Sequence, residues 1–249
     1  MTINLTTRTT ATPARAAGRV TGRGTGADTG RRRRLLTIPG VVGIGYSLSW
    51  IAGLAVPAPS PRFGAPGAQV VAALAGHGPA VATQFALTEG LPAAGIAVIS
   101  VALARAARQH GGAGSMSIGA GSIPGRLALA AGLVAAIISA LQFGLGLALT
   151  AITAPGPAHL LYASVDRLDG AKMLALAVLG AAAAAMTALP RWLRYTGIAL
   201  AITITCSGLV YLLLAASLAA AAGPALVLLL AFMTGCGIMI GMKADPRDR

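Results

Sequence analysis

Residues 80–104 have the sequence AVATQFALTEGLPAAGIAVISVALA and contain a single ionisable side chain, Glu89. A helix of about 20 apolar residues crosses the hydrocarbon core of a bilayer. The stretch lacks the alternation of a half-buried strand and is longer than a typical core helix. It therefore predicts a transmembrane helix.

Five other stretches have the same character, which gives six predicted spans near 35–56, 80–104, 127–152, 172–189, 195–218 and 224–242. The whole chain is 56% hydrophobic and 10% charged, whereas a soluble domain has about 25% charged residues. This composition excludes an ordinary soluble domain and a disordered chain. The predicted fold class is all-α: a polytopic transmembrane bundle of six helices. We expect one domain over 35–243, a disordered basic tail over 1–34 and a short tail over 244–249.

The charge distribution predicts the orientation. The chain has 19 Lys and Arg residues against 6 Asp and Glu residues. With the N-terminus inside, 16 of the 19 basic residues fall in cytoplasmic segments, as the positive-inside rule requires. Both termini are thus predicted to be cytoplasmic, and the net charge of +13 needs no nucleic acid. Abundant Arg, Ala and Gly indicate a high-GC bacterium, so we expect a multi-pass protein of the bacterial cell (inner) membrane.

Four consecutive arginines, Arg31, Arg32, Arg33 and Arg34, directly precede the first apolar run. The favoured interpretation is a positive-inside anchor. Anionic-lipid contact and a targeting peptide are the alternatives. The lipid bilayer is the predicted partner, and the sequence indicates no particular protein partner.

Glu89 lies nine residues from the outer end of its predicted span, about 14 Å at 1.5 Å per residue. A charged carboxylate at such a depth costs about 2.5–3.5 kcal/mol. Glu89 should therefore face the bundle and be partnered or protonated. Pro92 lacks an N–H group for the carbonyl of Thr88, so the helix should bend there.

Other spans place polar side chains at a similar depth of about 15 Å. We expect a buried polar layer centred on Glu89, with Gln142 as its partner. The candidate ligand or proton site comprises Glu89, Thr88, Gln142, Ser207, Tyr211 and Thr234. Two interpretations stay open: a structural network between helices and a site that handles a ligand or a proton.

Residues 153–171 are predicted to form an outer loop, and a charged cluster lies where it meets the fourth span: Asp166, Arg167, Asp169 and Lys172. In the favoured interpretation Asp169 caps the fourth helix, Lys172 pairs with it, and the cluster is solvated. The alternative is binding. A metal site formed with His77 and His159 is conceivable, but the spacing follows no ligand motif, so no metal is predicted.

Known catalytic motifs are not found: the sequence contains no P-loop, no G-x-S-x-G, no H-E-x-x-H and no C-x-x-C-H. An enzyme is therefore unsupported, and no cofactor is predicted. The weakest hypothesis is an enzyme for lipid-like substrates that uses His159, Asp166 and Asp169. Separately, Gly237 with Gly241 and Ser49 with Gly53 have the spacing typical of close helix packing.

Three stretches, 43–50 (GIGYSLSW), 167–173 (RLDGAKM) and 190–193 (PRWL), resemble uncharacterised six-helix integral membrane proteins of actinobacteria. The resemblance implies an inner-membrane protein of unknown function. It supplies no catalytic or binding residues.

Two functional hypotheses follow. The favoured one is a structural or accessory component of the bacterial cell membrane, in which the polar layer sets helix packing. The alternative is a small-solute or proton-coupled transporter, with Glu89 as the titrating carboxylate.

Overall fold

The computed structural model describes residues 37–62, 64–110, 123–213 and 222–242. The predicted tails, Arg31 to Arg34 and most of the glycine-rich connector between the second and third spans lie outside these residues. Regular structure within the described part is entirely helical. The all-α prediction is thus confirmed there.

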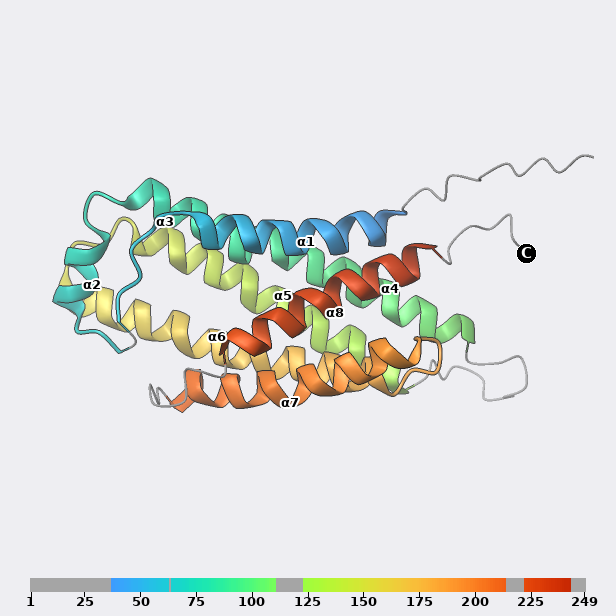
Figure 1. Ribbon diagram of the computed structural model, residues 1–249. Helices are drawn as coiled ribbons and strands as arrows, with labels where there is room; N and C mark the ends of the chain where they lie inside the picture. Colours follow the sequence, from blue (N-terminus) through green and yellow to red (C-terminus); the bar gives the residue numbers. More distant parts are fainter. Residues whose placement is uncertain (1–36, 63, 111–122, 214–221, 243–249) are drawn as a thin grey trace, which may run out of the picture. The chain divides into compact units, whose positions relative to one another are not determined.

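The helices follow one another along the chain (Figure 1). They are α1 (Ile38–Ala55), α2 (Gly67–Leu74), α3 (Gly78–Phe85), the π-helical turn η1 (Ala86–Gly90), α4 (Leu91–His110), α5 (Ile123–Leu149), α6 (Pro155–Ala184), α7 (Arg191–Leu213) and α8 (Ala222–Met242). Five helices in the described part are long and apolar enough to cross a membrane: α1, the continuous helix from α3 through η1 to α4, α5, α7 and α8. The chain is a helical membrane protein.

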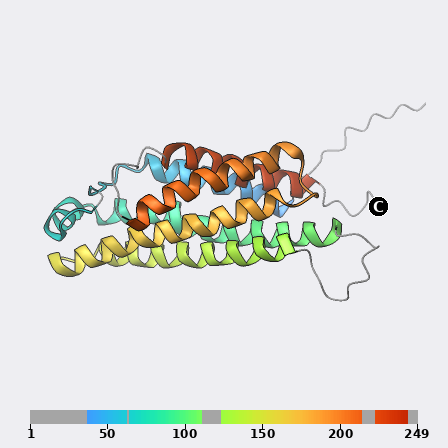
Figure 2. The same cartoon turned by 90° about the horizontal axis from the view of Figure 1, so that it is seen from below.

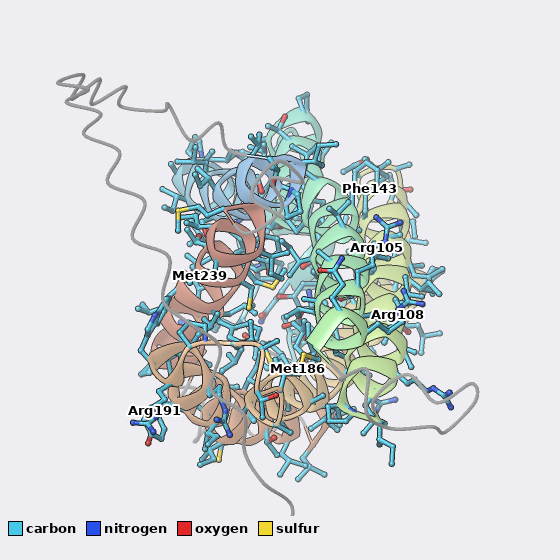
Figure 3. All side chains as sticks on the ribbon, turned by 90° about the vertical axis from the view of Figure 1, so that its right-hand side faces the viewer. Arg105, Arg108, Phe143, Met186, Arg191 and Met239 are labelled. Carbon is cyan, nitrogen blue, oxygen red and sulfur yellow. The ribbon has the colours of Figure 1, made fainter. Side chains whose placement is uncertain are left out.

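The long helices form a closed ring. Among the described residues, α4 packs against α1 and α5, α6 against α5 and α7, and α8 against α7 and α1. The view along the bundle shows this ring with side chains filling its interior (Figure 3). Each long helix is thus held by two neighbours.

Glycines bring some neighbouring helices into close contact. A Cβ atom added to Gly43 of α1 would lie 3.1 Å from the Cα of Gly237 on α8. The same pairing occurs between α6 and α7, where a Cβ on Gly180 would lie 2.9 Å from the carbonyl oxygen of Gly197. Small residues allow membrane helices to approach closely. The close packing predicted for Gly237 is therefore present, and Gly53 packs against Thr88 in the same way.

The start of the fourth predicted span was wrong. α6 begins at Pro155, so most of the predicted outer loop 153–171 is helical, and the helix ends at Ala184 rather than at 189. Proline at the N-terminus of α6 is compatible with a helix because the first N–H groups have no intrahelical acceptor. At 30 residues, α6 is about 45 Å long at 1.5 Å per residue. It thus exceeds the roughly 30 Å of a bilayer core.

The segment between α1 and α3 packs against the N-terminal part of α6. α2 packs against it, Tyr162 Oη donates to the carbonyl of Pro61 at 2.9 Å, and His159 Nδ1 lies 3.1 Å from the carbonyl oxygen of Ala65. This region is seen at the left of Figure 1. We call this end of the bundle the far end.

The opposite end carries the arginines, and we call it the arginine end. Its described arginines are Arg105, Arg108, Arg126, Arg191 and Arg194. Three of them, Arg105, Arg108 and Arg191, are labelled in the view on to this end (Figure 3). Arg194 Nε donates to the carbonyl of Ala184 at 2.7 Å, which caps the end of α6.

The interior near the arginine end is apolar. Its fully buried side chains include Leu103, Leu193, Phe232, Met233 and Cys236. Figure 2 shows α5, α6 and α7 running side by side from this apolar region towards the far end. The polar interior therefore lies nearer the far end.

Candidate functional site

Every acidic residue of the described part belongs to one interior group. These residues are Glu89 on η1 and Asp166 and Asp169 on α6, and they lie with Lys172, also on α6. We call these four side chains the acidic cluster. Glu89, Asp166 and Lys172 are buried, and Asp169 is partly buried. A group of this composition inside a ring of apolar helices is the strongest candidate site in the described structure.

Glu89 faces the interior of the ring and is fully partnered. Lys172 Nζ lies 2.7 Å from its Oε1 and 2.8 Å from its Oε2, and Ser139 Oγ on α5 donates to Oε2. The ion pair joins residues 83 positions apart in sequence. Because an unpaired charge in such surroundings is costly, these contacts are what allow a carboxylate at this position.

Lys172 is shared between two carboxylates. Its Nζ also lies 2.7 Å from Asp169 Oδ1, one helical turn away on α6. The ring of Trp50, on α1, has its centroid 6.0 Å from the same ammonium, within cation–π range. Three helical segments therefore converge on one cation: α1, η1 and α6.

Gln142 contacts the cluster, but its partner differs from the prediction. Its Nε2 donates to Asp169 Oδ1 at 3.4 Å and to the carbonyl of Val165 at 3.1 Å, and no bond to Glu89 is found. Both of those partners are acceptors, which fixes the orientation of the amide. The prediction that Gln142 pairs with Glu89 was wrong because α6, predicted as a loop there, inserts its own polar side chains.

Two buried oxygen atoms beside Asp169 have no hydrogen-bond partner among the described residues. They are Gln142 Oε1 and Asp166 Oδ2. Gln142 is 2% exposed and Asp166 is 8% exposed. Buried acceptors without a donor are uncommon in proteins. Each of these oxygens could accept a hydrogen bond from a donor or bind a cation.

The charges of the cluster do not balance. One ammonium group, that of Lys172, opposes the three carboxylates of Glu89, Asp166 and Asp169. Arg167, which follows Asp166 in the sequence, is exposed on another face of α6. The described arginines at the arginine end lie several helical turns away. Fully ionised, the cluster would therefore carry a surplus of two negative charges. Bound protons or cations are the ordinary ways to offset such a surplus.

The cluster lies around the middle of α6, farther from the arginine end than the apolar part of the interior. Counted from Ala184 at 1.5 Å per residue, Lys172 is about 18 Å, Asp169 about 22 Å and Asp166 about 27 Å along α6. Glu89 is about 22 Å from Ala104 by the same count. Counted from residue 80 instead, the outer end of the predicted span, Glu89 is about 14 Å deep.

The other predicted site residues do not form a single layer with Glu89. Thr88 Oγ1 donates to the carbonyl of Gln84, and Ser207 Oγ donates to that of Thr203, so both bond within their own helices. Thr234 Oγ1 lies 2.7 Å from Ser47 Oγ, between α8 and α1. Tyr211 lies on α7 and is partly buried. Thr88, Ser207 and Thr234 therefore form hydrogen bonds with partners other than Glu89.

The disruption expected at Pro92 takes the form of a π turn. The backbone N–H of Leu91 donates to the carbonyl of Ala86, five residues earlier. Such single π turns occur mostly as insertions in α-helices and often at functional sites. Glu89 lies inside this turn, so the irregular backbone and the interior carboxylate coincide.

The outer-loop interpretation of Asp166, Arg167, Asp169 and Lys172 was wrong for three of the four. Arg167 is exposed, but Lys172 and Asp166 are buried and Asp169 lies within the cluster. The predicted pairing of Lys172 with Asp169 is present, inside the bundle rather than in solvent. Hydropathy alone misplaced these residues because four charged side chains within seven positions lower the average.

The residues suggested for an enzyme or a metal site are not brought together. His159 lies about two helical turns from Asp166 along α6, roughly 10 Å, and its ring bonds to Ala65. His77 bonds to the nearby carbonyl of Ala75. The described residues contain no group of three or more His, Cys, Asp or Glu side chains that could hold a metal ion.

Ser139 and Trp50 are site residues that the sequence analysis did not name. Ser139 precedes Gln142 by three positions, so the two share a face of α5. The exposed positions 160, 164, 167, 178 and 181 of α6 lie along one strip at helical spacing, but most of their residues are apolar, so no polar pattern in the sequence marked this helix. That spacing places Asp169 on the opposite face.

Comparisons with known proteins add no identity: no family model, curated protein or solved structure matches this chain. The geometry of the acidic cluster is therefore the basis for any functional statement finer than a helical membrane protein.

Proposed function

We propose that the chain is a proton-coupled membrane carrier in which Glu89 binds and releases the proton. The observation that carries the proposal is the surplus of carboxylates over ammonium groups in a buried, interhelical cluster. Ionisable side chains inside membrane domains commonly mark ion and proton pathways.

The arrangement around Lys172 suggests how the proton acts. When Glu89 is ionised, Lys172 is shared between Glu89 and Asp169. A proton that binds to Glu89 converts the carboxylate to a neutral acid, and Lys172 then pairs with Asp169 alone. The link between η1 and α6 is thereby weakened, while the pair within α6 stays. Proton binding would thus loosen one helix contact of the ring.

A structural role is the second candidate, and one observation favours it. Glu89 is already satisfied by Lys172 and Ser139, so it can serve as a fixed bridge between η1, α5 and α6. In that case Glu89 stays ionised throughout the physiological pH range.

Infrared difference spectroscopy of the purified full-length protein separates the two candidates. If the protein is a carrier, a protonated-carboxyl band should appear when the pH is lowered. Glu89→Gln should remove this band. The matched control Asp245→Asn, at a position outside the described residues, should retain it. If wild type and Glu89→Gln give the same carboxyl bands across the pH range, Glu89 does not bind a proton and the carrier proposal fails.

The placement in the membrane is part of the proposal. We propose six crossings, with α6 as the sixth, both termini in the cytoplasm and the bacterial inner membrane as the location. The gathering of described arginines at one end supports this orientation. Contact of Arg31 to Arg34 with anionic lipid, and kinship with the actinobacterial membrane proteins, remain predictions.

A further inference from the structure

Beyond the proton-binding Glu89, we propose that Asp166, Asp169 and Gln142 form a binding site for a monovalent metal cation, Na⁺. The two partnerless oxygens, Gln142 Oε1 and Asp166 Oδ2, belong to side chains that flank Asp169. The proposal does not require that Glu89 bind a proton, and its experiment can succeed or fail separately.

The three side chains are held close together by the fold. Asp166 and Asp169 are three positions apart on α6, where side chains are neighbours on one face of a helix. Gln142 reaches them from α5, since its Nε2 bonds both to Asp169 and to the carbonyl of Val165, next to Asp166. Carboxylate and amide oxygens are hard ligands suited to such an ion.

The charge of the cluster favours a cation over a water molecule. A water molecule could donate hydrogen bonds to both oxygens, but it would leave the surplus of two negative charges unchanged. One Na⁺ together with one proton on Glu89 would offset that surplus. The cation site therefore complements the proposed proton site.

A monovalent ion fits better than a divalent one. Lys172 Nζ lies 2.7 Å from Asp169, and its positive charge would repel a divalent ion on the same carboxylate more strongly.

The exposure of Asp169 indicates the side from which a cation reaches the site. The Asp169 side chain is 20% exposed, against 8% for Glu89 and 5% for Lys172. Arg167 is exposed on α6, and Asp169, two positions further on, lies about 160° around the helix from it at 100° per residue. Towards the arginine end the interior is closed by Phe232, Met233 and Cys236. Access is thus expected from the far end.

The chain offers a built-in reporter for the test. Trp50 lies beside Lys172, and the second tryptophan, Trp192, is exposed in the described structure. A Trp192→Phe variant of the full-length protein in detergent therefore reports through Trp50 alone. NaCl is titrated against choline chloride at constant ionic strength, with KCl and CaCl₂ as further arms. Equilibrium dialysis with radioactive Na⁺ counts the bound ions.

The expected result is a saturable Trp50 signal with NaCl and one bound Na⁺ per chain. Asp166→Asn in the same background should weaken the apparent Kd about tenfold or more, because a charged ligand is lost. Asp245→Asn is the matched control and should leave the Kd unchanged, and Glu89→Gln should retain binding.

Several results would overturn the site. One is a Trp50 signal that choline chloride produces as well as NaCl, and another is the absence of bound Na⁺ in dialysis. A Kd for Na⁺ that Asp166→Asn leaves unchanged, or saturation by Ca²⁺ in preference to Na⁺, would also overturn it. Loss of Na⁺ binding in Glu89→Gln would place the ion on Glu89 instead of on the proposed side chains. The infrared test of Glu89 is read out independently of all of these.

Discussion

Lys172 is the side chain on which the interior depends. It lies within ion-pair distance of both Glu89 and Asp169 and is 5% exposed. Without its ammonium group, three carboxylates would share an apolar interior. Removing one partner of a buried ion pair costs far more than the pair itself contributes, because the other charge is left uncompensated.

We therefore expect Lys172→Met to lower the free energy of unfolding by about 3–5 kcal/mol. Glu89→Gln should cost much less, because Lys172 keeps Asp169 and the surplus negative charge falls. Thermal unfolding in detergent, followed by circular dichroism, measures both variants. Equal melting temperatures for the two variants would contradict this account of the cluster.

A variant that lacks three of the four charges serves as the control for that prediction. Replacing Glu89, Asp169 and Lys172 together by Gln, Asn and Met removes the charges as a set. Since a buried ion pair contributes little net stability against neutral residues of similar volume, this triple variant should recover most of the stability lost in Lys172→Met.

Two helix pairs in this bundle, α1 with α8 and α6 with α7, approach closely at glycines. Gly43 and Gly45 lie on the same helix, α1, yet their surroundings differ. A Cβ on Gly43 would lie 2.8 Å from the carbonyl oxygen of Met233 on α8, whereas a Cβ on Gly45 would have nothing within 4 Å. The same substitution at Gly43 and at Gly45 therefore separates the effect of packing from the effect of helix propensity.

Gly43→Val should accordingly destabilise the protein by about 1–3 kcal/mol, the usual cost of overpacking. Gly45→Val, two positions away, should be nearly neutral. Urea or thermal unfolding of the two variants checks the difference. Similar stabilities for both would mean that the α1–α8 contact is looser than the structure indicates.

The bundle as a whole places the two described ends of the chain at the same end of the ring. Thr37 Oγ1, just before α1, donates to the carbonyl of Gly241 near the end of α8 at 2.9 Å. Five of the seven described arginines lie at this end too, the exceptions being Arg62 and Arg167. Under the positive-inside rule we expect this end to face the cytoplasm.

Reporter fusions test that orientation. Alkaline phosphatase, which is active only outside the cytoplasm, should be inactive when fused after Met242. It should be active when inserted at Pro59, between α1 and α2. A green fluorescent protein fused at Met242 should fluoresce. Phosphatase activity at Met242 would reverse the proposed topology.

Hydropathy and charge were sufficient to predict an all-helical membrane protein, the apolar helices and an interior position for Glu89. These features depend on local composition: about 20 apolar residues make a span wherever the rest of the chain lies. The close packing at Gly237 and Gly53 was predictable for the same reason, since small residues at helical spacing are a local pattern.

The partners of Glu89 depended on the three-dimensional arrangement. Lys172 is 83 positions away, in a stretch whose average hydropathy is lowered by its own charges and which was therefore predicted to be a loop. The charges of Asp166, Asp169 and Lys172 are tolerated inside the bundle because they offset one another and Glu89 across helices. No local pattern reports such mutual compensation, so the acidic cluster became visible when the helices were packed together.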